Sequence, residues 1–427
     1  MLATLRQRNF ALLWIAGLIS VAGDFALLTA LPLHAYALTG SALASGAVFA
    51  ASLLPRVVLS SFAGVFVDRW DRQRTMVVAD LMRALALLPL LAVGSADLLW
   101  LLYLVRLATG TLALFFNPAE SALLPRLVGE DRLVSANALN ALNDNLGRLV
   151  GPAFGGVLYA TGGLGTVVVV DAASFVVSAW CIAAIHAMTR PERRDVNSNQ
   201  TSAIRRVLDE WRAGLHLIRG DRALGTMFLA FSIGLLGEGT FEVGIVPLAV
   251  TVLGGGAAVL GILLSAQALG GIVAGAGIAR ASAVVAPRLL FGGGLIGIGL
   301  IDLGLANAAH LTPPGVSPLV LASGFMVLAG FPAVASFAAG NGLVQSLTPD
   351  AFRGRVFGAL EAVSGVATLL GLALGGLAID SVGVVPVLSV GAMMWIAGGV
   401  VALVRLSPTL GAPSAGAQHP TNAEGLP

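Results

Sequence analysis

Ionisable side chains lie at a few positions deep inside the long apolar runs of this chain. A charged side chain at the centre of a membrane costs about 2.5–3.5 kcal/mol on insertion scales, so such groups usually bind a ligand, transfer a proton or form an ion pair. We single out seven as candidates for proton coupling or for lining a substrate cavity: Asp24, Arg56, Arg106, Asp144, Arg148, Glu238 and Glu242.

Three of these candidates are carboxylic acids at related places in the two halves of the chain. Asp24 shortly precedes Pro32, and in the same way Glu238 shortly precedes Pro247. Glu242 follows Glu238 by one turn of a helix and would share its face. Burial disfavours the charged form of a carboxylate, so such acids can exchange protons near neutral pH. The alternative is that they cap a neighbouring helix or pair with an arginine.

Two of the arginines inside apolar runs have an acid within one helical turn. Asp144 and Arg148 are spaced i, i+4, and Asp80 and Arg83 are spaced i, i+3. Both sets are therefore expected to form ion pairs on one helix face. Arg56 has no such partner nearby in the sequence, and we expect it to face the cavity.

The elements that carry these residues must be membrane helices. The chain is 57% hydrophobic and only 11% charged, whereas soluble domains carry about 25% charged residues. Its backbone groups must bond within each segment in lipid, so each apolar run is expected to be a helix. Twelve runs predict an all-α integral membrane protein, near residues 10–38, 43–67, 74–95, 98–120, 135–160, 163–188, 223–252, 257–279, 286–308, 316–346, 352–378 and 383–406.

Arginine is the basic residue at all 24 basic positions, and its distribution predicts the orientation of the helices. Every connection on one face carries arginine, whereas the connections near residues 39–42, 96, 161, 255, 311 and 381 carry none. By the positive-inside rule both termini are cytoplasmic. We therefore expect a multi-pass protein of the bacterial cytoplasmic membrane. The absence of lysine excludes a phosphate-loop lysine, and with it ATP-driven pumping by this chain alone.

The chain divides into two similar halves. We expect a six-helix bundle over residues 1–188, a cytoplasmic linker with an amphipathic helix over 189–222, a second six-helix bundle over 223–406 and a disordered cytoplasmic tail over 407–427. The pattern Gly151-x-Ala-x-Gly155-Gly156 recurs as Gly371-x-Ala-x-Gly375-Gly376. Two six-helix repeats are expected to bind a substrate at the membrane midplane between them.

A short charged loop between the second and third runs resembles the signature loop of major facilitator superfamily (MFS) transporters. Its matching residues are Gly64, Asp68, Arg69, Arg72 and Arg74, whereas Asp71 stands where most of that superfamily has glycine. The resemblance implies a cytoplasmic gate, in which Asp68 meets the start of the eleventh helix beside Arg353 and Arg355 when the transporter faces outward.

Two further motifs carry the same resemblance. The fifth run matches the motif associated with antiporters and exporters of the superfamily at Gly147, Gly151, Pro152, Gly155 and Gly156. Leu102-x-x-x-Arg106-x-x-x-Gly110 resembles the motif of the fourth helix, where the arginine is associated with proton coupling. Asn117-Pro118-Ala119 and Arg353-Gly354-Arg355 resemble the branch of macrolide efflux pumps and the enterobactin exporter.

These observations predict a proton-coupled exporter of a hydrophobic or amphipathic small molecule, such as an antibiotic, siderophore or other secondary metabolite. We expect the proton gradient as the energy source, no cofactor, no metal site, no nucleic-acid partner and a functional monomer in the lipid bilayer. One alternative is the same fold importing a nutrient or moving a lysophospholipid. The others are a transporter-like receptor and a membrane enzyme, for which the sequence offers neither a nucleophile–base pair nor an output domain.

Overall fold

The computed structural model describes residues 2–67, 70–186 and 216–407, and the statements below concern these residues. All the regular elements described are helices, and eleven of them are long and apolar enough to cross a membrane. The expected all-α membrane fold is confirmed. The linker expected over 189–222, with its amphipathic helix, falls mainly outside the described residues, as do Asp68, Arg69 and the tail from residue 408.

The first half of the chain forms a bundle whose long helices cross the full thickness of the molecule. Short 3₁₀ turns join some of them at their ends. The elements are α1 (Leu2–Leu5), α2 (Arg8–Thr39), α3 (Ala42–Val67), α4 (Arg72–Leu87), η1 (Leu88–Ala92), η2 (Ala96–Leu98), α5 (Leu99–Val128), η3 (Glu130–Arg132) and α6 (Leu133–Ala183).

Helix α6 accounts for two of the twelve expected crossings. Its 51 residues would extend about 76 Å at 1.5 Å per residue, more than twice the ~30 Å hydrocarbon core of a bilayer. The backbone at Gly163 is non-helical, with φ 68° and ψ −168°. This positive φ suits glycine and separates the fifth crossing from the sixth.

The second half forms a matching bundle. Its first helix, α8, ends at Pro247 and continues as one π-helical stretch, η4. The elements are α8 (Arg222–Pro247), η4 (Leu248–Val252), α9 (Gly256–Ala281), α10 (Pro287–Ala306), α11 (Ala308–Leu311), α12 (Pro318–Leu347), η5 (Asp350–Phe352), α13 (Arg353–Val382) and α14 (Val384–Arg405).

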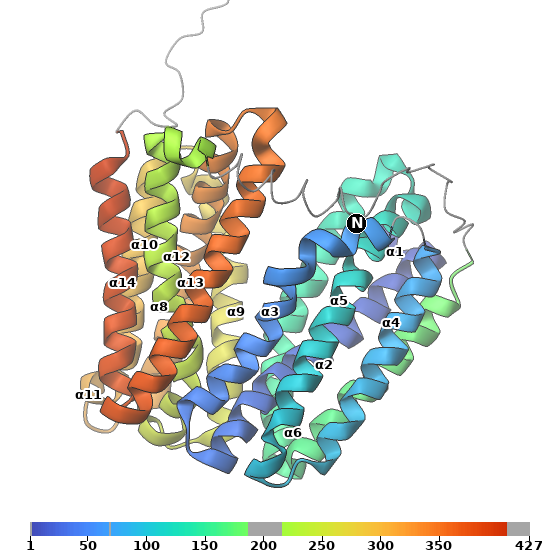
Figure 1. Ribbon diagram of the computed structural model, residues 1–427, viewed down its shortest axis with the longest axis horizontal. Helices are drawn as coiled ribbons and strands as arrows, with labels where there is room; N and C mark the ends of the chain where they lie inside the picture. Colours follow the sequence, from blue (N-terminus) through green and yellow to red (C-terminus); the bar gives the residue numbers. More distant parts are fainter. Residues whose placement is uncertain (1, 68–69, 187–215, 408–427) are drawn as a thin grey trace, which may run out of the picture.

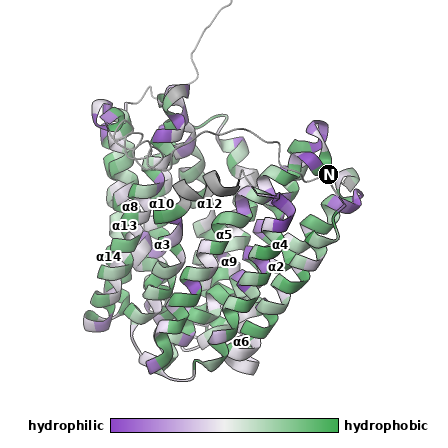
Figure 2. Cartoon of the chain, turned by 45° about the vertical axis from the view of Figure 1, so that its right-hand side comes forward, coloured by the Kyte–Doolittle hydropathy of each residue, from purple (hydrophilic) through white to green (hydrophobic). Residues whose placement is uncertain are grey.

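The two bundles stand side by side and are closest at one end. In Figure 1 they diverge toward the end that carries the N-terminus, and converge at the opposite end, where the chain turns at Gly40, Gly163 and Gly383. Figure 2 shows hydrophilic residues gathered at the diverging end and mostly hydrophobic residues along the helices. Below, the converging end is called the closed end.

Paired glycines hold the helices together within and between the bundles. A side chain on Gly155 would meet the backbone of Ala26 in the same bundle, whereas one on Gly156 would meet the backbone of Ala257 in the other. The second repeat shows the same division, because Gly375 faces Thr240 of its own bundle and Gly376 faces Leu43 across the boundary. The boundary therefore has two seams, α6 against α9 and α3 against α13.

Candidate functional site

A cavity of about 680 Å³ lies between the bundles and receives residues from both. Such a volume is within the usual range of small-molecule sites. Its wall combines aromatic rings with charged and amide side chains, in which Phe25, Phe49 and Phe241 supply the rings and Asp144, Arg148, Glu238 and Glu242 supply the charges. Four of the seven residues singled out in the sequence thus line one cavity.

On the N-terminal side of the cavity, Asp144 and Arg148 do not form the ion pair that their spacing predicts. Among the described residues no nitrogen–oxygen contact of 4 Å or less joins them, and the Arg148 guanidinium lies 5.3 Å from the centre of the Phe25 ring. A cation over a ring face is attracted by the ring's electron density. Asp144 and Arg148 still interact electrostatically, but the direct contact that their spacing predicts is missing, because α2 brings the Phe25 ring to the guanidinium.

On the opposite side, α8 projects Glu238 and Glu242 into the cavity. The two carboxylates interact electrostatically, and Asp302 on α10 interacts with Glu238 from outside the cavity lining. No arginine forms an ion pair with these three acids in the part of the chain that the structure describes. The C-terminal bundle therefore contains a cluster of three acids, Glu238, Glu242 and Asp302, that has no cationic partner among the described residues.

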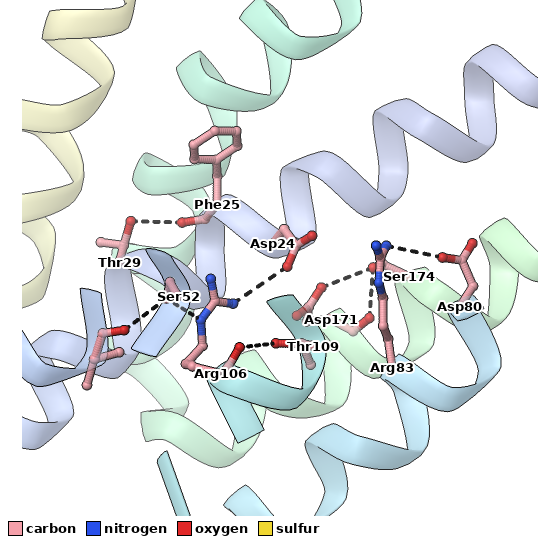
Figure 3. Close-up of polar contacts among 11 residues, drawn as sticks. Asp24, Phe25, Thr29, Ser52, Asp80, Arg83, Arg106, Thr109, Asp171 and Ser174 are labelled. Atoms are coloured by element: carbon pink, nitrogen blue, oxygen red, sulfur yellow. Dashed lines mark hydrogen bonds and ion pairs between the residues drawn. The ribbon is translucent and has the colours of Figure 1, made fainter. Parts of the chain in front are cut away.

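Asp24 and Arg106 form a loose ion pair inside the N-terminal bundle. Their charged atoms are 3.7 Å apart, and the Asp24 side chain is 42% exposed. The Arg106 Nε–H also donates to the Ser52 hydroxyl of α3 at 2.9 Å, as Figure 3 shows. Arg106 is thus held in place by α3 as well as by Asp24.

A second pair, Asp80 with Arg83, is fixed much more firmly. Their charged atoms are 3.4 Å apart, and the Asp80 side chain is completely buried. The Ser178 hydroxyl donates to Asp80 at 2.6 Å. The Arg83 guanidinium lies 5.0 Å from the Phe116 ring centre and 5.4 Å from that of Phe175. The ion pair predicted from the i, i+3 spacing is confirmed.

Asp171 lies between these two pairs (Figure 3) and interacts electrostatically with Asp24, Arg106 and Arg83. Its Oδ1 accepts a hydrogen bond from the Ser174 hydroxyl, while its Oδ2 is buried without a hydrogen-bond partner in the described residues. A side chain at Gly23 would overlap with both Asp171 and Ser174. The glycine before Asp24 therefore allows α2 to approach this buried acid.

Arg56 does have a partner, contrary to the expectation from the sequence. Its Nε–H donates to Glu361 of α13 at 2.7 Å, and the side chains are 67% and 49% exposed. Arg56 is also absent from the cavity lining. The residue therefore joins α3 to α13 across one seam.

Comparison with known proteins decides the family. Residues 1–424 match the family described as transmembrane secretion effector. A Bacillus subtilis protein named as an uncharacterized MFS-type transporter is 27% identical over 88% of each chain, and the multidrug efflux pump Tap of Mycolicibacterium fortuitum is 29% identical over 87% of this chain and 89% of its own. The chain belongs to the transmembrane secretion effector family of MFS transporters.

Other matches agree with this assignment. Macrolide efflux protein A of Streptococcus pyogenes is 26% identical over 52% of this MFS chain and 54% of its own length. Among solved structures, a bacterial homologue of the iron transporter ferroportin in an inward-facing state has a TM-score of 0.73 at 14% identity, covering 93% of this chain and 98% of its own. The nucleoside transporter NupG gives 0.74 at 14%, with the same coverage. These structures show the shared fold.

The charged loop of this MFS transporter is described on both sides of Asp68 and Arg69. Asp71 caps helix α4, where its carboxylate accepts the Arg74 N–H at 2.8 Å. Aspartate is a favoured N-cap because it satisfies backbone N–H groups that the helix leaves free. This explains physically why aspartate fits where most MFS loops have glycine. Arg72 donates to the Ala122 carbonyl at 3.0 Å and so ties the loop to α5.

The expected partner of this loop, the start of α13, makes local contacts in this conformation. Arg353 pairs with Asp350 at 2.8 Å, and the Arg355 guanidinium lies 5.2 Å from the Phe352 ring centre. Gly64 lies in the last turn of α3. The contact predicted between Asp68 and this helix start lies outside the described residues and stays a prediction.

The fifth-helix motif of this transporter packs closely against α2 and forms a hydrogen bond to the other bundle. Side chains on Gly147 and Gly151 would meet Val21 and Phe25 of α2, so both positions are in close contact with that helix. Near Pro152, the Ala153 N–H donates to the Ser265 hydroxyl of α9 at 3.1 Å. Proline interrupts the backbone hydrogen bonding of its helix. Here a serine of the other bundle accepts a hydrogen bond from the backbone N–H that follows the proline.

Sequence reasoning missed several ionisable residues inside the apolar runs. Asp171 and Asp302 lie next to the predicted Asp24 and Glu238, Glu120 accepts a hydrogen bond from Asn140 at 3.2 Å, and Glu361 partners Arg56. Each was visible by its residue type alone, because every ionisable group within such a run is a candidate. Family motifs and repeat symmetry pointed to other positions, because these four residues belong to neither.

Proposed function

We propose that this MFS transporter is a proton-coupled exporter of hydrophobic or amphipathic small molecules that works by alternating access. The observation that carries the proposal is the central cavity, which combines three phenylalanine rings with Glu238 and Glu242. The rings suit an apolar ligand surface, and the carboxylates suit a proton or a positively charged group. Efflux pumps among the relatives support the outward direction.

Coupling requires acids that reach the cavity and change charge during the cycle. Glu238 and Glu242 line the cavity and lack a cationic partner in the described structure, whereas Asp24 lies outside the cavity lining and has a loose pair with Arg106. Protonation of these acids removes charge that alternately faces each side of the membrane. We assign Arg106 the role of stabilising ionised Asp24, because Ser52 keeps its guanidinium nearby.

The proton gradient supplies enough free energy for this work. Each proton moving inward releases about 2.3 kcal/mol per 100 mV of membrane potential and about 1.4 kcal/mol per pH unit. A tenfold concentration ratio corresponds to about 1.4 kcal/mol. One or two protons per cycle therefore support export against a tenfold to hundredfold gradient.

We place both termini in the cytoplasm of a bacterial cell. Several long helices begin or end with arginine, at Arg8, Arg72, Arg222, Arg353 and Arg405, whereas the turns at Gly40, Gly163 and Gly383 carry none, which fits the positive-inside rule. With this orientation the bundles diverge toward the cytoplasm, and the conformation is inward-facing. We propose that the transporter works as a monomer.

Transport in inside-out membrane vesicles tests the function directly. A panel of amphipathic antibiotics and dyes is offered with an imposed proton gradient, and we expect uptake that collapses when a protonophore is added. Uptake that is unaffected by the protonophore would overturn the coupling. Transport only in right-side-out vesicles would favour a nutrient importer, and movement of labelled lysophospholipid alone would favour the lipid transporter. Binding without movement would favour a receptor.

Labelling in intact cells tests the orientation. In a Cys181→Ala background, Val284→Cys places a thiol at an exposed position near the arginine-rich end, and Leu311→Cys places one near the closed end. We expect a membrane-impermeant maleimide to label the second variant only. Labelling of the first would invert the proposed topology.

A further inference from the structure

The closed end contains a contact between the bundles that no motif predicts. The Asp380 carboxylate belongs to the last turn of α13, in the C-terminal bundle. It accepts the Ser41 hydroxyl at 2.6 Å and the Ala42 N–H at 2.7 Å, and the Leu43 N–H lies 3.5 Å from it. All three donors belong to the start of α3 in the N-terminal bundle.

This contact caps a helix of one bundle with a side chain of the other. The first N–H groups of a helix have no partner within it. At the start of α3, Asp380 binds Ala42 and Leu43, while the Ser41 hydroxyl oxygen accepts the Ala44 N–H at 3.3 Å. Asp380 is exposed, so separation of the bundles at this end would replace its carboxylate with water as the acceptor of the Ala42 and Leu43 N–H groups.

Asp380 gains less from its own helix than from its partner. A helix carries partial negative charge at its C-terminus and partial positive charge at its N-terminus, so an acid is favoured at a helix start and disfavoured near a helix end. Asp380 lies near the end of α13 and on the start of α3. Its carboxylate is therefore better stabilised when the two bundles touch than when they part.

The second seam lacks this contact, although the repeat places equivalent elements there. Asp380 follows Gly376 by one helical turn, and Ala160 follows Gly156 in the same way. The alanine side chain has no hydrogen-bond acceptor, and the start of α9 has no side-chain cap at Gly255. Both seams are thus packed through glycine, but only one is joined by a carboxylate.

We propose that Asp380 is a latch that holds the closed end shut and must release α3 before the transporter can open there. The closing of the α3–α13 seam forms the charge-assisted bonds, and its opening breaks them. The inference goes beyond the proposed function, because it requires alternating access but neither proton coupling nor a direction of transport. Ser41 acts as the latch's second half, since it both binds Asp380 and caps α3.

Distance measurements between the bundles test the latch. Spin labels on Thr161→Cys and Leu311→Cys, both at exposed closed-end positions in a Cys181→Ala background, report the separation there in lipid nanodiscs. We expect Asp380→Ala to raise the population with long distances about fivefold or more, within the usual range of conformational coupling. Asp380→Asn should give a smaller rise, because its amide oxygen still accepts one N–H.

Two further variants make the result specific. Ser381→Ala is the matched control, because the Ser381 hydroxyl bonds only the Ala378 carbonyl of its own helix in the described structure. Ser41→Ala removes one of the bonds to Asp380 and should shift the population less than Asp380→Ala does. If Asp380→Ala gives the same distances as Ser381→Ala, or lowers thermal stability without changing them, Asp380 is only a structural cap and the latch is wrong. Because the readout is a distance, a loss of proton coupling would leave the measured populations interpretable.

Discussion

The two bundles have similar helices but hold their buried charges in opposite ways. In the N-terminal bundle, Arg106 and Arg83 each form an ion pair with an aspartate. An aromatic ring packs against the guanidinium of Arg83, and a serine hydroxyl accepts a hydrogen bond from that of Arg106. In the C-terminal bundle, Glu238, Glu242 and Asp302 form no ion pair among the described residues.

This difference indicates that paired and unpaired charges have different roles in the two repeats. A paired and buried charge is costly to change, since removal of one partner leaves the other uncompensated. An unpaired carboxylate in a cavity is free to take up a proton or to bind a cation. In the proposed mechanism, the Asp80–Arg83 pair of the N-terminal bundle stays fixed, and Glu238 and Glu242 of the C-terminal bundle exchange protons. Asp24 lies between the two cases, because its pair is loose and its side chain is 42% exposed.

The largest expected effect comes from Asp24→Asn. The amide keeps the size of the side chain but cannot carry the charge that Arg106 stabilises, so we expect gradient-driven export to fall to background while substrate binding stays detectable. Vesicle transport with and without a pH gradient, together with equilibrium binding to purified protein, measures both quantities. Undiminished uphill export would remove Asp24 from the mechanism and leave Glu238→Gln as the next variant to test.

A second prediction contrasts one paired and one unpaired charge through stability. Arg83→Ala leaves Asp80 buried without its counter-charge and should lower the free energy of unfolding by about 3–5 kcal/mol. Asp302→Asn is the matched control, because it removes a partly buried carboxylate that has no ion-pair partner in the described structure, and its effect should be far smaller or stabilising. Denaturant titration in detergent micelles measures both. Equal losses would contradict the proposed difference between paired and unpaired charges.

The cavity acids lead to a smaller, substrate-dependent effect. Glu242→Gln should weaken binding of a cationic amphipathic compound by about tenfold, or ~1.4 kcal/mol, and leave a neutral analogue of the same size nearly unaffected. Binding of the same two compounds to Asp144→Asn provides the comparison, because Asp144 also lines the cavity but does so beside Arg148. Titration calorimetry with the two compounds distinguishes the outcomes. Equal weakening of both ligands would assign Glu242 a structural role.

The smallest effect is expected at Arg56. Its ion pair with Glu361 is more than half exposed at the arginine, and exposed pairs contribute only about 0–1 kcal/mol. Arg56→Ala should therefore change the transport rate by less than about fivefold. A double-mutant cycle with Glu361→Ala measures the coupling between the two residues. A loss of export as complete as that of Asp24→Asn would place Arg56 in the coupling machinery after all.

The helices and their repeat could be predicted from the sequence because both depend on local patterns. Each crossing is a run of apolar residues, and the glycine motifs recur in the second half. The near-equivalence of Asp24 and Glu238 also has a structural counterpart. Gly23 allows contact with Asp171, and Gly237 closely approaches the Gly391 carbonyl in the second bundle.

The partners of the charges could not be predicted, because they depend on which helices meet. Arg56 and Glu361 are separated by 305 residues, and Ser41 and Asp380 by 339. The i, i+4 rule predicts a pair for Arg148, but that rule considers one helix in isolation. In the folded protein, α2 brings the Phe25 ring to the guanidinium instead.

The sharp turns at the closed end limit the binding of antibodies and proteases and the insertion of epitope tags on that side. Three of the reversals use one or two residues, and Gly40, Gly163 and Gly383 take φ values of 66°, 68° and 91° to make them. Antibodies and proteases bind exposed loop tips, which these turns scarcely provide. In the proposed topology this side faces outward, so an inserted epitope tag has room only where the connections are longer, within residues 93–98 or 307–317.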